Sequence, residues 1–374
     1  INLFMYLYLK MKLQAFNKGS KHYQIVSRSC FQWTSMIGTL YNQFGQLNIK
    51  VLLVCPYDLE HFGGVQNQVK LLKNGLVNKG IDTKILGPSS YDYDIGNAIK
   101  IPFNGSQNPI SFFPRKKIIK EAISWADVIH VHEPFMPFFF WRLHTKKKII
   151  VTHHANIGNF INSCLKFLYL FTRYKKLYST AVSSEALNNA TALNKEIVII
   201  PNMIQINKDI RYVDNGNFLF IGRNEKRKNL KLFVQLANYY ESKFKFIAVT
   251  NEKTANKSVI FHISPSEIDK QSIISNVGIY IAPNKKSESF GITILEAINH
   301  GNVTICSDIK AFKELLNDSG IFFSNDNFED LKDTISNLKE ENLSEIWSKQ
   351  YDYISKNYSM EKVLQKWIYV YKNI

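Results

Sequence analysis

Short apolar runs alternate with amphipathic stretches along the chain from Ile49 onward. The first run, Lys50–Val54, is a short, unbroken apolar segment of the kind that forms a strand covered on both faces in a parallel sheet. It leads through Gly63 and Gly64 into a stretch, ending at about Lys79, whose apolar residues recur at helical spacing. This order predicts a strand, a glycine loop and a helix.

The same alternation repeats further along the chain. Apolar runs of strand length predict strands at residues 82–86, 128–131, 149–152, 180–183 and 197–200. Helical stretches lie between several of these runs, and such an order favours a doubly wound α/β domain.

A polar segment, residues 205–216, follows and indicates a linker. The strand, loop and helix order restarts at Phe218–Gly222 and continues through apolar runs at residues 246–250, 279–282 and 303–306. A chain of 374 residues is too long for one hydrophobic core, so we expect two α/β domains facing each other. The final segment, Met360–Tyr371, has apolar residues at helical spacing and predicts a C-terminal helix.

Residues 1–48 do not follow this pattern. Their apolar opening is interrupted by Lys10 and Lys12, so it is too short to span a bilayer, and no convincing small-residue cleavage site follows it. We interpret the segment as an accessory extension of unknown role, with Met36 as an alternative start just before the first strand.

Composition and charge narrow the possible partners. Lys and Arg number 47 against 31 Asp and Glu, a formal net charge of +16, which favours phosphorylated ligands, anionic lipid surfaces or nucleic acid. The four cysteines show neither a disulfide framework nor zinc-ligand spacing, so a reducing cytoplasm is the expected compartment.

The candidate chemistry centres on a loop that leads into a helix. Glu288 precedes the expected helix and Glu296 lies on its second turn, a separation on the order of 12 Å. After Ser289, the free N–H groups near Phe290, Gly291 and Ile292 are expected to face an anion between the two carboxylates. The alternative is a surface loop that enters a core helix without a ligand.

Two glutamates at this spacing, followed by Ala297 and Gly301, resemble the signature of the retaining glycosyltransferases of family 4. The resemblance covers residues 49–374 and implies the GT-B fold: two Rossmann-like doubly wound domains facing a central cleft, with a C-terminal helix that crosses back to the first domain. It implies an N-terminal acceptor domain at 49–204, the linker at 205–216, a nucleotide-sugar donor domain at 217–358 and the returning helix at 359–374.

The glycine loop adds to this resemblance. Cys55–Asp58 together with Gly63–Gln66 is similar to the corresponding loop of the phosphatidylinositol mannosyltransferase branch of the family. The resemblance implies that Gly63 and Gly64 let a diphosphate approach the N–H groups at the helix start. A tight turn without a ligand is the alternative.

A basic run follows the first strand of the second domain. Taken alone it indicates a solvated basic face, but Arg223 and Lys228 match the two cations that clamp the donor diphosphate in the family. Fixed cations stabilise the negative charge that grows on the departing nucleoside diphosphate. We interpret Arg227 as a bystander.

His153 and His154 follow the expected strand at 149–152, at the sheet edge where ligands bind. The family has a histidine beside the transferred sugar here, and His154 matches it better. For His130 and His132, at the end of the preceding strand, a structural role is the favoured interpretation, and Glu133 is expected to line the cleft.

The resemblance therefore implies a hexosyltransferase that moves a sugar, with retention, from a nucleotide-diphosphate sugar to a hydroxyl acceptor. It implies that Glu288 binds sugar hydroxyls, Glu296 binds the ribose, and the leaving phosphate helps take the acceptor proton. GDP-mannose is the favoured donor, UDP-sugars follow, and no cofactor is implied. We expect no Asp-x-Asp string at a strand end anywhere in the chain, so no metal site is predicted.

Two patterns depart from the family: Pro201–Gln205 lacks the usual glycine, and Val303 follows Gly301–Asn302 where a proline is usual. These differences bear on donor and acceptor preference rather than on the fold.

An apolar segment with a basic end follows His154 and is too short to span a membrane. Its cations Arg173, Lys175 and Lys176 favour a helix lying on an anionic membrane face, which would deliver a lipid such as phosphatidylinositol as acceptor. A buried core helix is the alternative. The expected location is then the inner face of the membrane. A same-fold enzyme with a soluble or polysaccharide acceptor and a non-catalytic protein that binds nucleic acid or an anionic surface are the rival interpretations.

Overall fold

The structure is a computed structural model of the 374-residue chain. It describes residues 48–61, 63–96, 98–100, 109–111, 113–134, 143, 145–155, 177–190, 197–240, 243–286, 288–338 and 342–374. Residues from Ile49 to the C-terminus form one compact unit.

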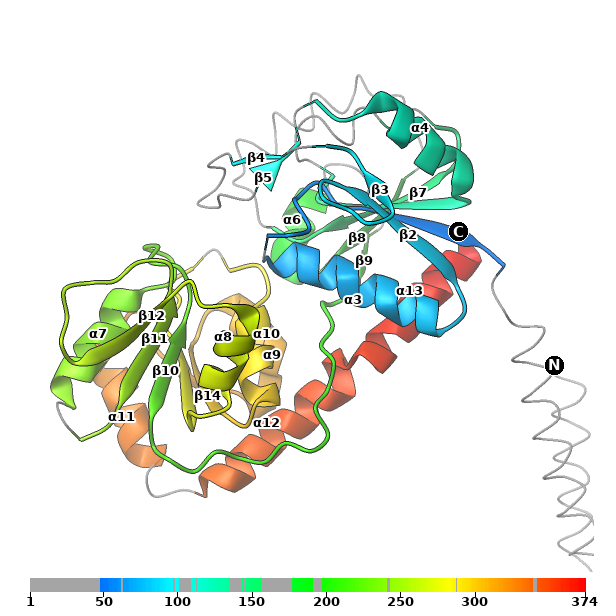
Figure 1. Cartoon of the computed structure of the whole chain (residues 1–374). Coiled ribbons are helices and arrows are strands. Elements are labelled where there is room, and N and C mark those ends of the chain that lie inside the picture. The colour runs from blue at the N-terminus through cyan, green and yellow to red at the C-terminus, as the bar shows by residue number, and fades with distance from the viewer. Residues whose placement is uncertain are drawn as a thin grey trace, which may run out of the picture. The chain divides into compact units, whose positions relative to one another are not determined.

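Seven strands form the first sheet, in the order β3-β2-β1-β6-β7-β8-β9, and every neighbouring pair is parallel (Figure 1). Their bounds are β1 Lys50–Val54, β2 Asp82–Gly87, β3 Tyr93–Asp94, β6 Val128–His132, β7 Lys148–His153, β8 Leu177–Ala181 and β9 Ile197–Ile199. A separate antiparallel pair joins β4 Ile99–Lys100 and β5 Pro109–Ile110.

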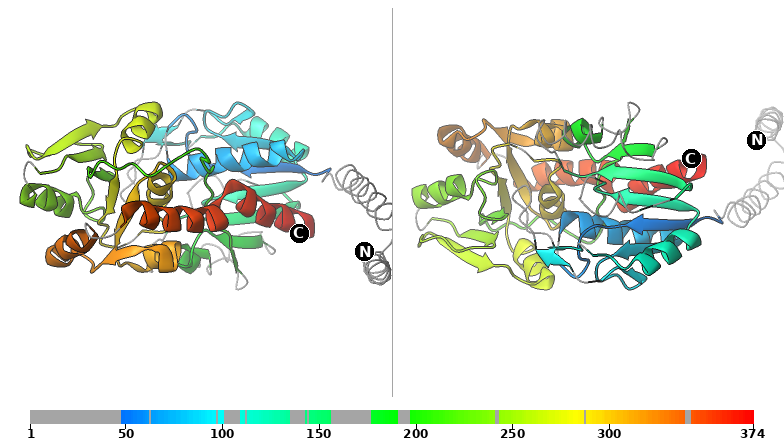
Figure 2. Two further views of the ribbon diagram at one scale, coloured as in Figure 1. Left: turned by 90° about the horizontal axis from the view of Figure 1, so that it is seen from below. Right: turned by 90° about the horizontal axis from the view of Figure 1, so that it is seen from above.

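Helices cover both faces of this sheet because its central strands are apolar on both sides. Residues 51–54 of β1 are all fully buried. Alternate residues, Leu52 and Val54, pack in the core with Ile119 and Ala122 of α4 Lys116–Trp125. The opposite face meets α3 Gly64–Asn78, which lies against the C-terminal helix α13 Met360–Asn373 in both views of Figure 2. The short α6 Ser184–Ala190 follows β8.

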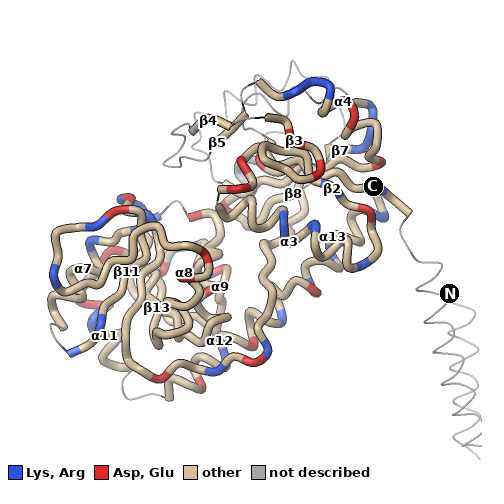
Figure 3. Tube along the Cα trace, in the orientation of Figure 1, with Lys and Arg blue, Asp and Glu red and all other residues tan. Residues whose placement is uncertain are grey.

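The outer surface of α4 is basic. Lys116, Lys117 and Lys120 are exposed there, and this stretch is blue in Figure 3.

Six strands form the second sheet, in the order β12-β11-β10-β13-β14-β15, again all parallel. Their bounds are β10 Phe218–Ile221, β11 Phe246–Thr250, β12 Val259–Ile263, β13 Ile279–Ala282, β14 Val303–Ser307 and β15 Ile321–Phe323. The helices are α7 Leu230–Tyr239, α8 Glu267–Ile274, α9 Ile292–Asn299, α10 Lys310–Leu316, α11 Phe328–Leu338 and α12 Leu343–Tyr358, with a 3-10 turn at Asn317–Ser319.

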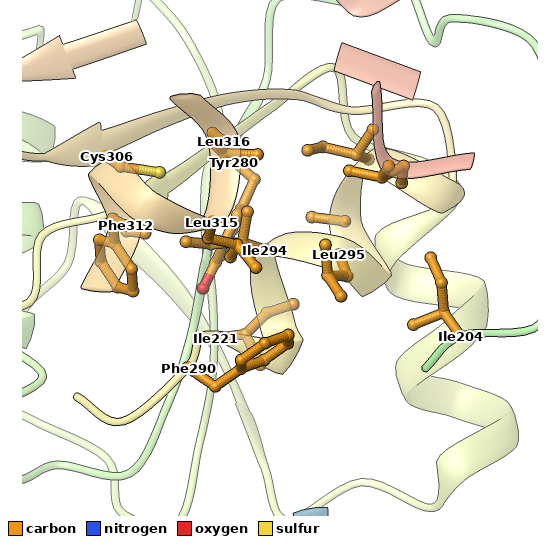
Figure 4. Packing of buried hydrophobic residues seen from close by; sticks show 14 of the residues in the cluster. Ile204, Ile221, Tyr280, Phe290, Ile294, Leu295, Cys306, Phe312, Leu315 and Leu316 are labelled. Atoms are coloured by element: carbon orange, nitrogen blue, oxygen red, sulfur yellow. The ribbon is translucent and has the colours of Figure 1, made fainter. Parts of the chain in front are cut away.

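The second sheet also has two cores, one on each face. On one face, Phe218 and Phe220 of β10 pack with α7 and α11. On the other, Tyr280 of β13 packs with Leu295 of α9 and Phe312 of α10, as Figure 4 shows. The alternation along each strand thus fixes which helices lie on which side.

The C-terminal helices return from the second sheet to the first. Helix α12 packs on β14, whereas α13 packs on α3. At their junction the linker passes alongside: the Ile204 N–H donates to the Tyr358 carbonyl at 2.9 Å, and the Met360 N–H donates to the Ile204 carbonyl at 2.8 Å. Ile204 and Ser359 form an isolated parallel bridge there.

These features confirm the predicted fold class, including the returning C-terminal helix. In each sheet the strand order reverses at one place, between β1 and β6 and between β10 and β13. Ligands bind outside the carboxyl ends of strands at such reversals.

Candidate active site

Both strand-order reversals carry predicted site residues. Arg223 and Lys228 follow β10, and Glu288 follows β13. Since the carboxyl ends of these neighbouring strands meet at one edge, the two loops are brought together.

The centre of the second-sheet site is the carboxylate of Glu288. Its Oε2 lies 2.6 Å from Nζ of Lys228 and 3.3 Å from Nη1 of Arg227, and Nδ2 of Asn284 donates to it at 2.7 Å. Three donors therefore converge on one oxygen. Oε1 makes no hydrogen bond or ion pair with any other described residue.

The pKa of Glu288 reflects this surrounding. Burial alone would raise it, but the charges of Lys228 and Arg227 and the hydrogen bonds from Lys228 and Asn284 outweigh burial and hold the pKa below its ordinary value. Glu288 is therefore a carboxylate at neutral pH, with one oxygen held and the other available to accept from a hydroxyl.

A glycine lets Lys228 lie against the strand end. A Cβ on Gly222 would stand 3.4 Å from Cγ and Cδ of Lys228, so the lysine stem packs over this residue. Glu225 binds both neighbouring guanidinium groups, with Oε1 at 3.1 Å from Nε of Arg223 and Oε2 at 2.7 Å from Nε of Arg227. The loop thus presents three cations, Lys228 and the two arginines, and the carboxylate of Glu225 holds both arginines in place.

Arg227, interpreted from the sequence as a bystander, lies beside Glu288 in the structure. Its guanidinium forms ion pairs with Glu288 and Glu225, whereas the guanidinium of Arg223 pairs only with Glu225 among the described residues. The backbone N–H groups of Lys228 and Asn229 donate to the Glu225 carbonyl and form a turn that sets the direction of each side chain in the loop. A run of basic residues in the sequence does not reveal this turn, so it does not show which cation lies beside Glu288.

The start of α9 carries the next group of predicted residues. Phe290 is buried and meets Tyr358 edge to face, with ring centroids 5.8 Å apart. Gly291, the N-cap residue, has φ 107°, which L side chains rarely adopt. The Ser289 carbonyl accepts from the hydroxyl of Ser183, in the turn before α6. The loop that leads into α9 is therefore held by the ring contact with Tyr358 and by the hydrogen bond from Ser183.

The glycine loop of the first sheet reaches this helix. A Cβ on Gly64 would stand 3.1 Å from Cδ1 of Ile292, so the start of α3 and the start of α9 are close neighbours. Gly63 is the N-cap residue of α3, with extended backbone. Two helix N-termini, both favourable to anions, therefore lie at one place.

Glu296, one helical turn further along α9, is paired with Lys270 of α8 at 2.9 Å. Both line a cavity of about 210 Å³ together with Asn67 of α3 and His300, the residue after α9. The Lys270 pair was not foreseen, because nothing in sequence links residues 26 positions apart on two helices.

The first sheet contributes a cluster of histidines at the ends of β6 and β7. Nε2 of His154 lies 2.9 Å from Nδ1 of His132, and Glu133 Oε1 accepts from the His154 backbone N–H at 2.8 Å. His153, the last residue of β7, is fully buried.

Burial controls the protonation of this cluster. It lowers the pKa of His154 to about 4, and the nearby side chain of Asn202 opposes this shift with a smaller effect. It raises the pKa of Glu133 to about 7, although the backbone N–H groups of His154 and Ala155 favour the carboxylate. The histidines are therefore neutral at physiological pH, and Glu133 titrates near it.

His130 is enclosed by protein groups, as its structural interpretation predicts. Thr180 donates to the Val151 carbonyl at 3.0 Å, so its oxygen accepts from Thr152 at 2.7 Å. Thr152 then accepts from Nε2–H of His130 at 2.6 Å, and Nδ1 accepts from the Tyr371 hydroxyl at 2.7 Å. This one-way chain ties α13 to the sheet. His132, by contrast, contacts His154 and belongs to the site.

One sequence observation needs correction. Asp92 and Asp94 form an Asp-x-Asp string, and Asp94 ends β3, a short strand that the apolar pattern did not reveal. Both carboxylates are used locally: Asp92 pairs with Lys73 at 2.6 Å, and Asp94 accepts from the Ser89 N–H at 3.0 Å. β3 is the edge strand of the first sheet.

The segment expected to lie on a membrane, with Arg173, Lys175 and Lys176, is outside the described residues. Among the helices that the structure describes, none is long and apolar enough to cross a bilayer.

Comparison with known proteins identifies the family of this chain. Residues 62–208 match the family model described as Glycosyltransferase Family 4, and residues 215–341 match the one described as Glycosyl transferases group 1. A phosphatidyl-myo-inositol mannosyltransferase of Mycobacterium leprae is 24% identical over 73% of this chain and 82% of its own length.

Two further relatives bear on the reaction and the fold. A GDP-mannose:cellobiosyl-diphosphopolyprenol alpha-mannosyltransferase of Xanthomonas oryzae is 24% identical over 67% of this chain and 73% of its own. The crystal structure of a glycosyltransferase from Rickettsia africae superposes with a TM-score of 0.64 at 19% identity, covering 87% of this chain and 98% of that one. The family models match the part of the chain that forms each sheet, and the fold is GT-B. This chain therefore belongs to glycosyltransferase family 4 and is a retaining hexosyltransferase that uses a nucleotide sugar.

Proposed function

We propose that this enzyme transfers mannose from GDP-mannose to a hydroxyl of a membrane lipid such as phosphatidylinositol. The donor is suggested by relatives named as mannosyltransferases, one of which is named for GDP-mannose. The lipid acceptor is suggested by the names of the same relatives and by the net charge of +16.

The observation that carries the proposal is the pair of cations on Glu288, Lys228 and Arg227, with Arg223 held by Glu225 in the same loop and two helix N-termini close to each other. Arg223, Lys228 and the N–H groups after Gly64 and Gly291 would hold the diphosphate. Oε1 of Glu288 would accept from sugar hydroxyls, Glu296 would bind the ribose, and His154 would orient the sugar near the acceptor. We also propose the division into an acceptor domain at 49–204 and a donor domain at 217–358, joined by the linker 205–216 and the returning helix.

The reaction needs no covalent enzyme intermediate. The bond between the anomeric carbon and the diphosphate oxygen breaks, and its electron pair stays on the phosphate. The acceptor oxygen bonds to the same face of the sugar, and its proton passes to the leaving phosphate oxygen. Cations fixed beside that phosphate stabilise the transition state because charge develops there.

The test is a hydrolysis panel in which the purified enzyme is mixed with GDP-mannose, GDP-glucose, UDP-glucose and UDP-galactose. Slow transfer to water should release nucleoside diphosphate fastest from GDP-mannose, and adding phosphatidylinositol vesicles should accelerate release and yield a mannosylated lipid. Preference for a UDP-sugar would replace the donor. Stimulation by a soluble glycan instead of vesicles would make the acceptor soluble.

A further inference from the structure

The loop that follows β15 reaches over the loops that follow three other strands of the second sheet. The backbone N–H of Asn325 donates to Oδ1 of Asp308, after β14, at 2.9 Å, and its side-chain amide donates to the carbonyl of Lys285, after β13. Asp326 contacts Lys285 again and also Asn229, after β10. Because all these strands are parallel, their carboxyl ends lie at one edge of the sheet, and this loop crosses that edge.

The carboxylate of Asp326 divides its two oxygens between two of these loops. Oδ2 lies 2.7 Å from Nζ of Lys285, and Oδ1 accepts from Nδ2 of Asn229 at 3.0 Å. The loop of Lys285 carries Glu288, and the loop of Asn229 carries Lys228. Asp326 therefore bridges the loop of the proposed sugar-binding carboxylate and the loop of the proposed phosphate-binding cation.

Two residues of this bridge have unusual backbone conformations. Asn229 has φ 57° and Asp326 has φ 59°, in the left-handed region that residues other than glycine rarely occupy. Asn229 is only 4% exposed, and although it is the N-cap residue of α7, its side chain makes no capping hydrogen bond. An asparagine at the N-cap usually accepts from the helix N–H groups, whereas the amide of this one donates to Asp326. Removing the carboxylate would leave a donor of this buried residue without its acceptor.

The direct pair of Lys228 and Glu288 does not replace this bridge once a donor is bound. In the proposed site Lys228 would turn to the diphosphate and Glu288 to the sugar, so their own contact would weaken. The loops would then be joined by the bond from the Lys285 N–H to the Arg227 carbonyl, at 2.8 Å, and by Asp326. Among the described residues, no hydrogen bond or ion pair joins Asp326 to Lys228 or Glu288, so a donor that engages those two side chains does not compete for it.

We propose that Asp326 is a positioning residue that sets the distance between Lys228 and Glu288 by holding their two loops. A nucleotide sugar needs the cation on its diphosphate and the carboxylate on its sugar at the same time, whereas a nucleoside diphosphate needs only the cations. The catalytic part of this inference rests on the proposed function, whereas the bridge itself does not.

The bridge is tested by hydrogen–deuterium exchange of the full-length enzyme, followed by mass spectrometry. The variant is Asp326→Gly, because glycine adopts the left-handed backbone without strain and the change removes the carboxylate. Exchange of peptides that contain Lys285 should become about three- to tenfold faster, since its N–H donates to Arg227 across the two loops. Unchanged exchange of these peptides in Asp326→Gly overturns the bridge.

Glu329→Ala is the matched control for this variant. It also removes an exposed carboxylate that pairs with a lysine, Lys332, but both partners of that pair lie within α11. Exchange of the peptides that contain Lys285 should therefore stay at the wild-type rate. Equal acceleration in Glu329→Ala and Asp326→Gly would show a general effect of lost surface charge and would contradict the bridge.

Kinetics with the preferred nucleotide sugar test the positioning role. Asp326→Gly should lower kcat by about three- to tenfold, the equivalent of one hydrogen bond. The dissociation constant of the matching nucleoside diphosphate, measured by calorimetry, should change by less than about twofold, because this ligand does not need Glu288. Glu329→Ala should keep wild-type values of both. Wild-type kcat in Asp326→Gly, or an equal loss of kcat and of nucleoside diphosphate affinity, means that Asp326 does not position the two loops for transfer.

Asp326→Asn shows whether the loss comes from the missing hydrogen bond. Asparagine also tolerates the left-handed backbone, and it keeps an oxygen that can accept from Asn229. It should therefore recover much of the kcat that Asp326→Gly loses. An Asp326→Asn variant as slow as Asp326→Gly would rule out the bond to Asn229 as the source of the effect.

A double-mutant cycle tests the same bond from its other end. The pair with Lys285 is partly exposed and contributes less than the bond to the buried Asn229. Asn229→Gly keeps the left-handed backbone and removes the amide, so it should lower kcat by itself, and combining it with Asp326→Gly should lower kcat no further. Losses that multiply in the double variant would show that the two residues act independently, against the proposal.

If exchange accelerates in Asp326→Gly but the wild type turns over no nucleotide sugar, the proposed function fails and the bridge stands. If the wild type is active and exchange does not change, the bridge fails and the proposed function stands. The two failures are therefore separable.

Discussion

Nζ of Lys228 lies 2.6 Å from Oε2 of Glu288, so the proposed phosphate-binding cation and the proposed sugar-binding carboxylate hold each other before any substrate arrives. The pair is mostly enclosed, with side-chain exposures of 13% and 14%. Each residue therefore prepares the position of the other, and a substrate that needs both meets a site already in place.

Removing the lysine should damage catalysis more than folding. Lys228→Ala should reduce kcat/KM by roughly ten- to a hundredfold, since a charge-assisted hydrogen bond contributes about 1.5–3 kcal/mol. Lys226→Ala, an exposed neighbour in the same loop, is the control and should stay near wild type. Initial rates at varied donor concentration give kcat/KM for both variants, and thermal unfolding gives their stability. The two measurements separate the effect on catalysis from the effect on folding. Wild-type kcat/KM in Lys228→Ala would refute the assignment.

Chelation should leave turnover intact. Cations and helix N-termini already neutralise the diphosphate in the proposed site, so EDTA should not lower the rate. The measurement is nucleoside diphosphate release with EDTA, compared with the same amount of Mg²⁺-saturated EDTA. Activity that disappears with EDTA and returns with Mg²⁺ or Mn²⁺ would overturn this expectation.

Gly291 should be intolerant of any side chain. Its φ of 107° is strained for other residues, and a Cβ would stand 3.0 Å from Cε1 of Phe312 and 3.1 Å from Cδ2 of Leu315. Gly291→Ala should cost about 1–3 kcal/mol of unfolding free energy from backbone strain, and more from crowding. It should also lower activity, because the N–H groups of α9 shift.

Gly96→Ala is the matched control for Gly291→Ala. Its φ is 106°, but the nearest atom to a Cβ is 3.6 Å away. Urea unfolding should show a smaller loss of stability, and the activity should be unchanged. Equal effects of the two substitutions on both stability and activity would contradict the role given to crowding at the start of α9.

Glu133 should make stability depend on pH in an unusual direction. Burial raises its pKa from 4.5 to about 7, so the folded state holds the proton more tightly than the unfolded chain. This contribution is fully present below pH 4.5 and is lost as the pH rises through about 7. It amounts to roughly 3 kcal/mol as an upper figure.

Glu133→Gln isolates this effect because the amide oxygen can still accept from the His154 N–H. The difference in unfolding free energy between variant and wild type, measured by urea titration at several pH values, should favour the variant increasingly from pH 5 to pH 8. Burial lowers the pKa values of the buried histidines, so their contribution to stability is lost in the opposite direction, as the pH falls below 6.5. This contribution is the same in the variant and the wild type, so it cancels in the difference. A difference that does not vary with pH would show that Glu133 keeps an ordinary pKa.

Membrane association is tested with liposomes. Co-sedimentation should rise with the fraction of anionic lipid, fall with salt, and weaken when Arg173, Lys175 and Lys176 are replaced by Glu. Replacement of Lys116, Lys117 and Lys120 on α4 changes the charge equally and serves as the control. Binding that ignores lipid charge, or that responds equally to both replacements, would leave a soluble acceptor as the better account.

Sequence reasoning recovered the fold because buried parallel strands are apolar on both faces. β1, β10 and β13 are unbroken runs, and each was expected at its observed place. β12 was missed because it is an edge strand with only its first residue buried, and β15 was missed because it has three residues. Neither leaves a periodic signal long enough to recognise.

The site was recovered less completely, for a physical reason. Motif residues such as Glu288 and Lys228 are visible in sequence, but the residues that hold them are not. Asn284 donates to Glu288, and His132 contacts His154 from 22 positions away. These partners become neighbours only through strand order, and a single polar residue after a strand carries no mark of its partner.

The bridge between Ile204 and Ser359 has a mechanical consequence. The chain passes between the two sheets twice, once in the linker and once where α12 gives way to α13, and the two passages are hydrogen-bonded to each other at this point. A joint with two strands clamped together resists twisting and sliding, and it leaves bending about one axis as the soft motion. We therefore expect a movement of one sheet against the other to turn about Ile204 and Ser359, because such a turn keeps the contacts of α13 on α3 and of α12 on β14.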